Sequence, residues 1–288
     1  MKGLAQASNI LIFILFSTLS VSLSAKDKFH VCADPLNPPF SIKADGGGSG
    51  FENKIAELFA NKLGQKVDYK WFPQRIGFIR NTLKARLPDS DLYTCDVVMG
   101  VPAGYDLALT TQPYYHSTYL LLITKARGWD DILKAEQLGE LSLQRRKDLR
   151  IAMFDRGPGT AWLQSMDLLD QGIPYQTMSG DDKNNTAMRI EKDLRAGKID
   201  MVILWGPMAG HVLSQSPENS YTVIQMTSRP GMKFDFSIAM AVRYGDKERQ
   251  AILNKLIGEN KQAIQGIMEG YQIPLLPIPK QQPREDDD

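Results

Sequence analysis

Polar and aromatic side chains follow the first apolar strand that the sequence predicts, at the place where open α/β sheets bind their ligands. Asp34, Asn37 and Phe40 come directly after the predicted strand over residues 29–33. Their carboxylate, amide and ring could form the wall of a cleft and hold a ligand by hydrogen bonds and apolar contact. The alternative is that the proline-rich segment 34–40 is a rigid turn that contacts no ligand.

A second group of candidate cleft residues follows the next predicted strand, over residues 67–72. Trp71, Arg75 and Phe78 could line the same cleft. The alternative is core packing for the two aromatic rings and a solvated position for Arg75. The sequence leaves both interpretations open.

In the second half of the chain, a loop over residues 155–160 opens a helix and contains Asp155, Arg156 and Thr160 among glycines and a proline. Free backbone N–H groups at such a helix start could hold an anion. The alternative is ordinary capping of the helix by Thr160. The loop does not match a phosphate-binding loop, because it lacks the Lys-Ser/Thr ending of that motif.

Large apolar side chains complete the set of candidates: Tyr114, Tyr115, Trp205 and Met208. They could form the apolar part of a cleft wall, since ligand pockets are lined mainly by such side chains. They could equally pack between two lobes and hold them together. The sequence does not separate these interpretations.

Catalytic and metal-binding motifs do not accompany these residues. The three histidines, His30, His116 and His211, do not fall at metal-ligand spacing with a cysteine or with each other. The serine-nucleophile pattern Gly-x-Ser-x-Gly does not occur either. We therefore expect a binding protein rather than an enzyme, without a metal or cofactor of its own.

The composition excludes other classes of partner. The chain has 288 residues, 43% of them hydrophobic, which is enough for more than one compact domain. Its 34 basic and 33 acidic residues are mixed along the sequence and leave a net charge of +1. A basic nucleic-acid footprint is therefore absent, and nothing favours steering toward membranes or polyanions.

Residues 1–25 have the features of a secretory signal peptide. Lys2 precedes an apolar stretch over residues 10–16, and small residues follow at 22–25. The alternative, a membrane span, would need a longer apolar run. We therefore expect a mature periplasmic protein with no membrane span. At the other end, the Pro-rich and acidic tail over residues 277–288 is predicted to be disordered.

The chain contains two cysteines, Cys32 and Cys95. In an oxidising compartment an even number of cysteines favours a disulfide, here a single bridge between predicted strands of one sheet. The alternative is two small buried hydrophobic side chains.

Strands and helices alternate along the mature chain and must position these side chains. The predicted strands cover residues 29–33, 67–72, 96–101, 119–124, 149–154, 200–205 and 236–242. The predicted helices cover residues 55–63, 74–87, the segment that the 155–160 loop opens, 188–196 and 247–269. Continuous apolar strands, such as 96–101 and 119–124, are typical of parallel sheets that are buried on both faces. Since the pattern restarts near residue 149, we expect two α/β lobes side by side.

Three motifs resemble those of the extracellular solute-binding proteins of family 3, the polar-amino-acid type: GFENKIAEL at 50–58, CDVVMG at 95–100 and QPYY at 112–115. The resemblance covers nearly the whole mature chain. It implies the type II periplasmic binding protein fold, an α/β protein of two lobes with parallel-rich sheets flanked by helices and two hinge crossovers. The expected division is 26–125 for the first part of lobe one, 126–240 for lobe two and 241–276 for the segment that returns to lobe one.

Longer stretches resemble the J proteins of methanol-oxidation gene clusters, the MxaJ, MoxJ and XoxJ type. The matching stretches are VCADP at 31–35, GFENKIA at 50–56, WFPQR-x-GF-x-RNTL at 71–83 and CDVVMGVPAG at 95–104. Members of that family are periplasmic and are encoded with quinoprotein methanol dehydrogenase. The resemblance implies a solute-binding-like accessory protein that assists assembly or activation of the PQQ-dependent methanol dehydrogenase, with that enzyme as its partner.

The sequence departs from the amino-acid receptors at the positions that hold a zwitterion. Where those receptors carry an Arg for the ligand carboxylate, residues 101–107 read VPAGYDL, and where they carry an acid for the ammonium, residues 204–207 read LWGP. Because an α-amino acid needs both groups, we do not expect one as ligand. The alternative function is that of an ABC-transporter substrate-binding protein for a small non-amino-acid ligand in the interlobe cleft.

Overall fold

The computed structural model describes residues 28–178, 180–181 and 183–279. The predicted signal peptide, 1–25, lies outside these residues, as does most of the predicted disordered tail, 277–288. In the part of the chain that is described, no helix is both long enough and apolar enough to cross a membrane.

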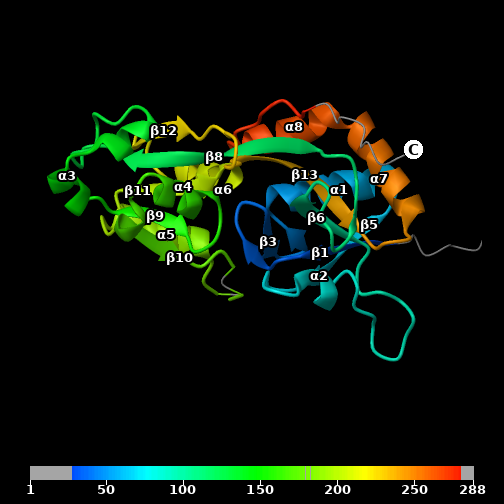
Figure 1. Ribbon diagram of the computed structural model, residues 1–288. Coiled ribbons are helices and arrows are strands. Elements are labelled where there is room, and N and C mark those ends of the chain that lie inside the picture. The colour runs from blue at the N-terminus through cyan, green and yellow to red at the C-terminus, as the bar shows by residue number, and fades with distance from the viewer. Residues whose placement is uncertain (1–27, 179, 182, 280–288) are drawn as a thin grey trace, which may run out of the picture.

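Two α/β lobes lie side by side in the structure, as the sequence predicts (Figure 1). Lobe one contains β1 (Lys28–Ala33), β2 (Leu36–Asn37), β3 (Ser41–Ala44), β4 (Gly47–Gly48), α1 (Phe51–Leu63), β5 (Lys66–Trp71), α2 (Phe78–Asn81), β6 (Val97–Pro102), β7 (Leu109–Thr110), α7 (Lys247–Glu259) and α8 (Lys261–Gly270). Lobe two contains the 3-10 helix η1 (Ala135–Glu140), α3 (Leu143–Lys147), β9 (Ile151–Phe154), α4 (Pro158–Ser165), the 3-10 helix η2 (Leu169–Gln171), β10 (Gly172–Tyr175), α5 (Thr186–Arg195), β11 (Met201–Trp205), α6 (Gly206–Ser214) and β12 (Tyr221–Gln225). Two strands cross between the lobes, β8 (Tyr115–Thr124) and β13 (Asp235–Val242).

The crossing strands join the sheets of the two lobes. The strand order is β10-β9-β11-β8-β13-β6-β1-β5, so β8 and β13 are neighbours in the middle. Within lobe one, β1 pairs in parallel with β5 and β6, and within lobe two, β9 pairs in parallel with β10 and β11. This arrangement confirms the predicted fold class of two lobes, parallel-rich sheets and two crossovers.

The chain crosses from one lobe to the other along two strands, so no single residue marks the boundary. Ser117 and Thr118 of β8 pair with β13, whereas residues 120–124 of the same strand pair with β11 and β12 in lobe two. The domain boundaries expected at 125/126 and 240/241 therefore stay predictions.

Burial on both faces of the sheet explains the apolar runs of the sequence. In lobe two, Leu121 and Ile203 belong to the core on one face of the sheet, whereas Leu122 and Val202 belong to the core on the other face. Successive side chains of a strand point to opposite faces, so a sheet covered on both sides needs apolar residues at every position.

The continuous apolar runs do not indicate whether a strand is parallel or antiparallel to its neighbours. The apolar run 119–124 predicts a parallel strand, and this prediction is wrong, because β8 pairs antiparallel with β11, β12 and β13. The strand also begins earlier, at Tyr115, since it must reach from one lobe into the other. Burial, not direction, dictates the continuous apolar pattern.

Two predicted helices differ in length. The helix expected over 74–87 is only the short α2, because Gly77 enters it with a left-handed φ of 85° and Thr82 leaves helical geometry. The Thr82 hydroxyl donates instead to the carbonyl of Phe78 at 2.6 Å. The helix expected over 247–269 is divided into α7 and α8 at Asn260, whose side-chain amide donates to the carbonyl of Leu256 at 2.8 Å. Such side chains compete with the backbone for its hydrogen bonds.

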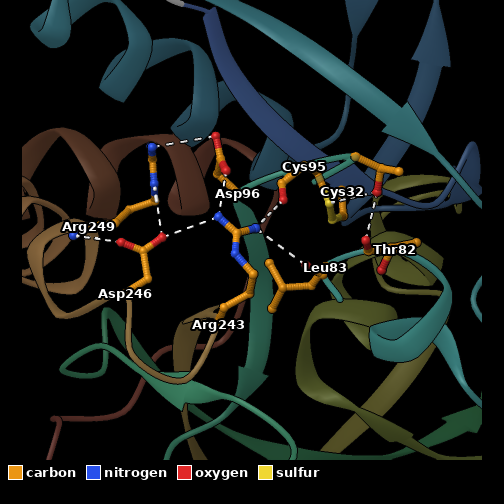
Figure 2. Close-up of polar contacts among 9 residues, drawn as sticks. Cys32, Thr82, Leu83, Cys95, Asp96, Arg243, Asp246 and Arg249 are labelled. Carbon is orange, nitrogen blue, oxygen red and sulfur yellow. Dashed lines mark hydrogen bonds and ion pairs between the residues drawn. A yellow bond between two sulfur atoms is a disulfide. The ribbon is translucent and has the colours of Figure 1, made fainter. Parts of the chain in front are cut away.

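The predicted disulfide is present between Cys32 on β1 and Cys95, which lies just before β6 rather than within a strand. Arg243, directly after β13, contacts the same segment (Figure 2). Its guanidinium donates to the carbonyl of Cys95 at 2.6 Å and to the carboxylate of Asp96 at 2.7 Å. The disulfide and the Arg243 contacts therefore hold β1, the start of β6 and the end of β13 together.

Candidate functional site

A cavity of about 260 Å³ lies between the two lobes, at the carboxyl ends of the parallel strands. Lobe one contributes the residues that follow β1, the first turn of α1 and the last residues of β6. Lobe two contributes the ends of β9 and β11 and the starts of α5 and α6. This is the edge at which α/β folds gather ligand-binding side chains.

Asp34 anchors the lobe-one wall of the cavity. Its carboxylate accepts the backbone N–H of Leu36 at 2.7 Å and that of Gln74 at 2.5 Å. Burial raises the pKa of Asp34, and these two backbone hydrogen bonds oppose the rise. Both carboxylate oxygens of Asp34 are thus engaged in holding the loops of the wall.

Glu52, in the first turn of α1, lies in a different environment. The start of α1 packs on the loop before β3, where the backbone N–H of Glu52 donates to the carbonyl of Phe40 at 3.0 Å. The Glu52 carboxyl lines the cavity beside Gly100 of β6, and no hydrogen bond or ion pair joins it to another described residue. Burial raises the pKa of Glu52 to about 8, which makes it a largely protonated acid at neutral pH.

Aromatic rings form the middle of the cavity and connect its two walls. Tyr119 on β8 contacts Trp205 at the end of β11, with ring centroids 5.4 Å apart. Tyr115, also on β8, lies near Trp205 and Glu52, since both influence the pKa of its phenol. Burial raises the pKa of Tyr119 to about 12 and that of Tyr115 well above its usual value, so both stay neutral phenols at physiological pH.

A polar contact across the cavity holds the lobes together. The side-chain amide of Asn185 in lobe two donates to the carbonyl of Leu36 at 3.1 Å and to the Asn37 side-chain oxygen at 3.3 Å. The oxygen of the same amide accepts the backbone N–H of Ala187 at 2.7 Å and so caps α5. One side chain therefore caps a helix and bridges the lobes.

Known proteins of similar sequence and structure share this architecture. No family model matches the chain. Protein MoxJ of Methylorubrum extorquens AM1 is 27% identical over 263 residues, which cover 86% of this chain and 82% of that protein. Protein MoxJ of Paracoccus denitrificans is 26% identical over 276 residues, or 90% and 92% of the two chains. The crystal structure of the periplasmic binding protein XoxJ from Methylobacterium extorquens AM1 is 30% identical, superposes with a TM-score of 0.66, and is covered over its full length by 87% of this chain.

The chain belongs to the MoxJ/XoxJ family of periplasmic binding proteins. The two lobes and the cavity between them are therefore those of a MoxJ/XoxJ-type protein.

Several side chains that the sequence nominates meet in the cavity of this MoxJ/XoxJ-type protein. The cavity is lined by Asp34, Asn37, Phe40, Phe78, Tyr115, Trp205 and Met208. They come from both halves of the chain, as expected for the cleft of a two-lobed fold. Cys32, one partner of the disulfide, also lines it.

Other nominated side chains lie outside the cavity. Trp71 stacks on Tyr69 with ring centroids 4.6 Å apart, and the exposed Arg75 lies over the ring of Phe72. Tyr114 is buried in the core of lobe one, next to Tyr115.

The loop over residues 155–160 also lies outside the cavity. Asp155 is exposed and accepts the hydroxyl of Thr177 at 2.6 Å, and Arg156 is exposed as well. Thr160 does not cap α4, since its hydroxyl donates to the carbonyl of Phe154 at 2.5 Å and the N-cap is Gly157.

Sequence reasoning missed Glu52, Tyr119 and Asn185. The signal for Glu52 was present: a helix that follows a strand in a parallel unit starts at the carboxyl edge of the sheet, so its first turn faces the ligand. Asn185 directly precedes the helix at 188–196, and an Asn in that position is a typical N-cap. Its second role, across the cavity, depends on tertiary structure that no local pattern contains.

The assembled site is suited to binding. Its described titratable side chains are acids and phenols, with no basic side chain to hold a ligand carboxylate. The walls combine two carboxyl groups with aromatic rings from both lobes. Such a cavity can enclose a small ligand when the lobes close.

Proposed function

We propose that this chain is a periplasmic, solute-binding-like accessory protein of methanol oxidation, which assists assembly or activation of the PQQ-dependent methanol dehydrogenase. The observation that carries the proposal is the similarity to MoxJ and XoxJ over most of the chain. The interlobe cavity supports a role based on binding and closure, since both lobes contribute to its walls.

A non-enzymatic role is part of the same proposal. Among the described residues, the cavity offers no pair of nucleophile and base, because Cys32 is held in the disulfide and no histidine or lysine lines the walls. Glu52 could donate a proton, but an acid alone does not form a catalytic constellation.

Closure gives a physical route to such an accessory function. Binding between the lobes changes the relative population of open and closed forms, and with it the shape of any surface that spans both lobes. A dehydrogenase that contacts both lobes would therefore favour one of these forms.

The alternative candidate is the receptor of an ABC transporter for a small non-amino-acid ligand. The described walls of the cavity contain no basic side chain that could pair with an amino-acid carboxylate. A ligand without a carboxylate therefore suits the cavity better. A receptor of this kind would need a cognate permease, and its loss would abolish uptake of the ligand without changing the dehydrogenase.

Deletion of the gene, with the dehydrogenase subunit genes intact, tests the proposal. We expect normal amounts of dehydrogenase protein but reduced specific activity and reduced PQQ absorbance per subunit in the purified enzyme. Restoring the gene in trans should restore both. Full specific activity in the deletion strain would contradict the accessory role.

A further inference from the structure

The interlobe cavity is lined by acidic side chains and, among its described residues, by no basic ones. Among the described residues that line it, Asp34 and Glu52 are the ones that can carry a full charge near neutral pH, and both are acids. An anion placed there would meet no cation, while a cation would meet two carboxyl groups in a partly desolvated space. The charged side chains that line the cavity therefore favour a cation over an anion.

Asp34 and Glu52 differ in how many of their carboxyl oxygens remain free to bind a ligand. Asp34 already accepts two backbone N–H groups, at 2.7 and 2.5 Å. Glu52 has no hydrogen-bond or ion-pair partner among the described residues, although its carboxyl lies beside Gly100 and close to Tyr114 and Tyr115. A half-buried carboxyl without a partner still pays a desolvation cost, so its presence on a cavity wall points to a partner that arrives from outside.

The aromatic rings favour an organic cation over a metal ion. Trp205 and Tyr119 lie in contact in the cavity, and the ring of Tyr115 lines the same cavity close to Glu52. Indole and phenol faces attract ammonium groups through their quadrupole. A hard divalent ion would require several oxygen ligands, whereas among the described lining residues only Glu52 offers an uncommitted carboxyl group.

We propose that the interlobe cavity binds a small organic cation, a primary ammonium compound without a carboxylate, whose ammonium group pairs with Glu52 and whose carbon skeleton packs on the aromatic rings. The inference rests on the proposed function only in taking the cavity as the ligand site, and it does not depend on the dehydrogenase.

The size and polarity of the cavity define the ligand further. A volume of about 260 Å³ is just below the usual range for ligand pockets, so the cation is a small molecule rather than a peptide. An α-amino acid would bring a carboxylate into a cavity that has no basic side chain among its described residues. The ligand therefore differs from a zwitterion in chemical class, not only in size.

Titration calorimetry of the purified mature protein tests this proposal. The probes are n-butylammonium and benzylammonium, each compared with its neutral counterpart, 1-butanol or benzyl alcohol, and with the zwitterion norvaline. The proteins are the wild type, Glu52→Gln, and Glu57→Gln as a matched control. Glu57 lies on the same helix, outside the cavity, and pairs with Lys54.

We expect at least one ammonium probe to bind the wild type about tenfold to hundredfold more tightly than its alcohol, and Glu52→Gln to remove that advantage. Glu57→Gln should bind like the wild type. At pH 7 Glu52 is largely protonated in the empty cavity, so binding should release close to one proton, measured from the enthalpy in two buffers. The Glu52→Gln variant should release none.

Three results would overturn the proposal: no binding of either ammonium probe, alcohols that bind as tightly as the ammonium compounds, or affinities that Glu52→Gln leaves unchanged. Circular dichroism of each variant, together with Glu52→Asp as a second variant that keeps the carboxylate, separates loss of the site from loss of the fold. Because dehydrogenase association is measured separately, failure of this proposal and failure of the proposed function give different results.

Discussion

Glu52 and Gly100 lie in close contact, and the absence of a side chain at Gly100 makes room for the Glu52 carboxyl. A side chain at position 100 would place its Cβ 2.1 Å from a carboxyl oxygen of Glu52, which is closer than any real contact. Glycine at this point of β6 therefore leaves the space that the carboxyl occupies. The pair lies at the edge of the cavity, where both residues contribute to its wall.

Removal of the titrating carboxyl of Glu52 should change how stability depends on pH. Because burial raises the pKa of Glu52 to about 8, the folded state keeps a proton that the unfolded state loses above its ordinary pKa of 4.5. The stabilising effect of this proton is complete below pH 4.5 and is lost as the pH rises to about 8. The free energy of unfolding of the wild type, relative to Glu52→Gln, should fall across this window by at most about 1.4 kcal/mol per pH unit.

Urea denaturation of both proteins between pH 4.5 and 9 measures this difference. Parallel stability profiles of wild type and Glu52→Gln would contradict the raised pKa.

The substitution Gly100→Ala should displace the Glu52 carboxyl and destabilise the protein by up to about 1 kcal/mol, because the atoms that must move are the far end of a flexible side chain. The matched control is Gly266→Ala, since Gly266 lies in α8 with open space around its Cα. The control should be neutral or slightly stabilising, because alanine favours a helix. Thermal unfolding measures both, and equal behaviour of the two variants would show that Gly100 is not constrained by Glu52.

At the residue scale, the sequence predicted one wall of the cavity better than the other. Asp34, Asn37 and Phe40 were predicted because they directly follow the first strand, where chain order and position at the sheet edge coincide. Tyr119 was not, because its position in the strand resembles that of any buried aromatic residue. Its place in the cavity follows from how β8 crosses the lobes.

The start of α5 connects local helix capping with closure of the lobes. The oxygen of the Asn185 amide caps the helix, and its nitrogen reaches Leu36 and Asn37 in lobe one. Asn185→Asp should keep the cap but place a carboxylate against two oxygen acceptors, the carbonyl of Leu36 and the side-chain oxygen of Asn37. Asn185→Ala should lose both contacts.

We expect Asn185→Asp to retain lobe-two stability and to shift the lobes toward an open form by about tenfold in population, since one or two hydrogen bonds are lost. Asn185→Ala should open the lobes and also lower stability by about 1 kcal/mol. Small-angle X-ray scattering should report an increased radius of gyration for both variants. A scattering profile of Asn185→Asp identical to that of the wild type would argue against a bridging role.

At the element scale, type and order were predictable, whereas length and direction were less so. The helix ending before Gly64 is present because apolar spacing and a left-handed glycine cap agree. The break at Asn260 and the short α2 depend on side-chain hydrogen bonds to the backbone, which compete with helical periodicity. The antiparallel direction of β8 depends on the topology of the whole chain.

Across the whole molecule, the two crossing strands determine both the fold and the site. β8 and β13 pair with each other in the middle of the sheet, and each is also bonded to the strands of one lobe. At the crossing, His116 of β8 contacts Ser237 and Asp235 of β13, each at 2.9 Å. The connection between the lobes is therefore a hydrogen-bonded pair of strands.

We propose that this two-lobed protein acts by binding to methanol dehydrogenase. Sedimentation velocity of the mature protein mixed with purified PQQ-dependent methanol dehydrogenase, with and without its cofactor, tests it most directly. We predict a defined complex, with at least one form of the dehydrogenase, that sediments faster than either component. Independent sedimentation of both components with either form of the dehydrogenase, at concentrations up to the micromolar range, would contradict the claim.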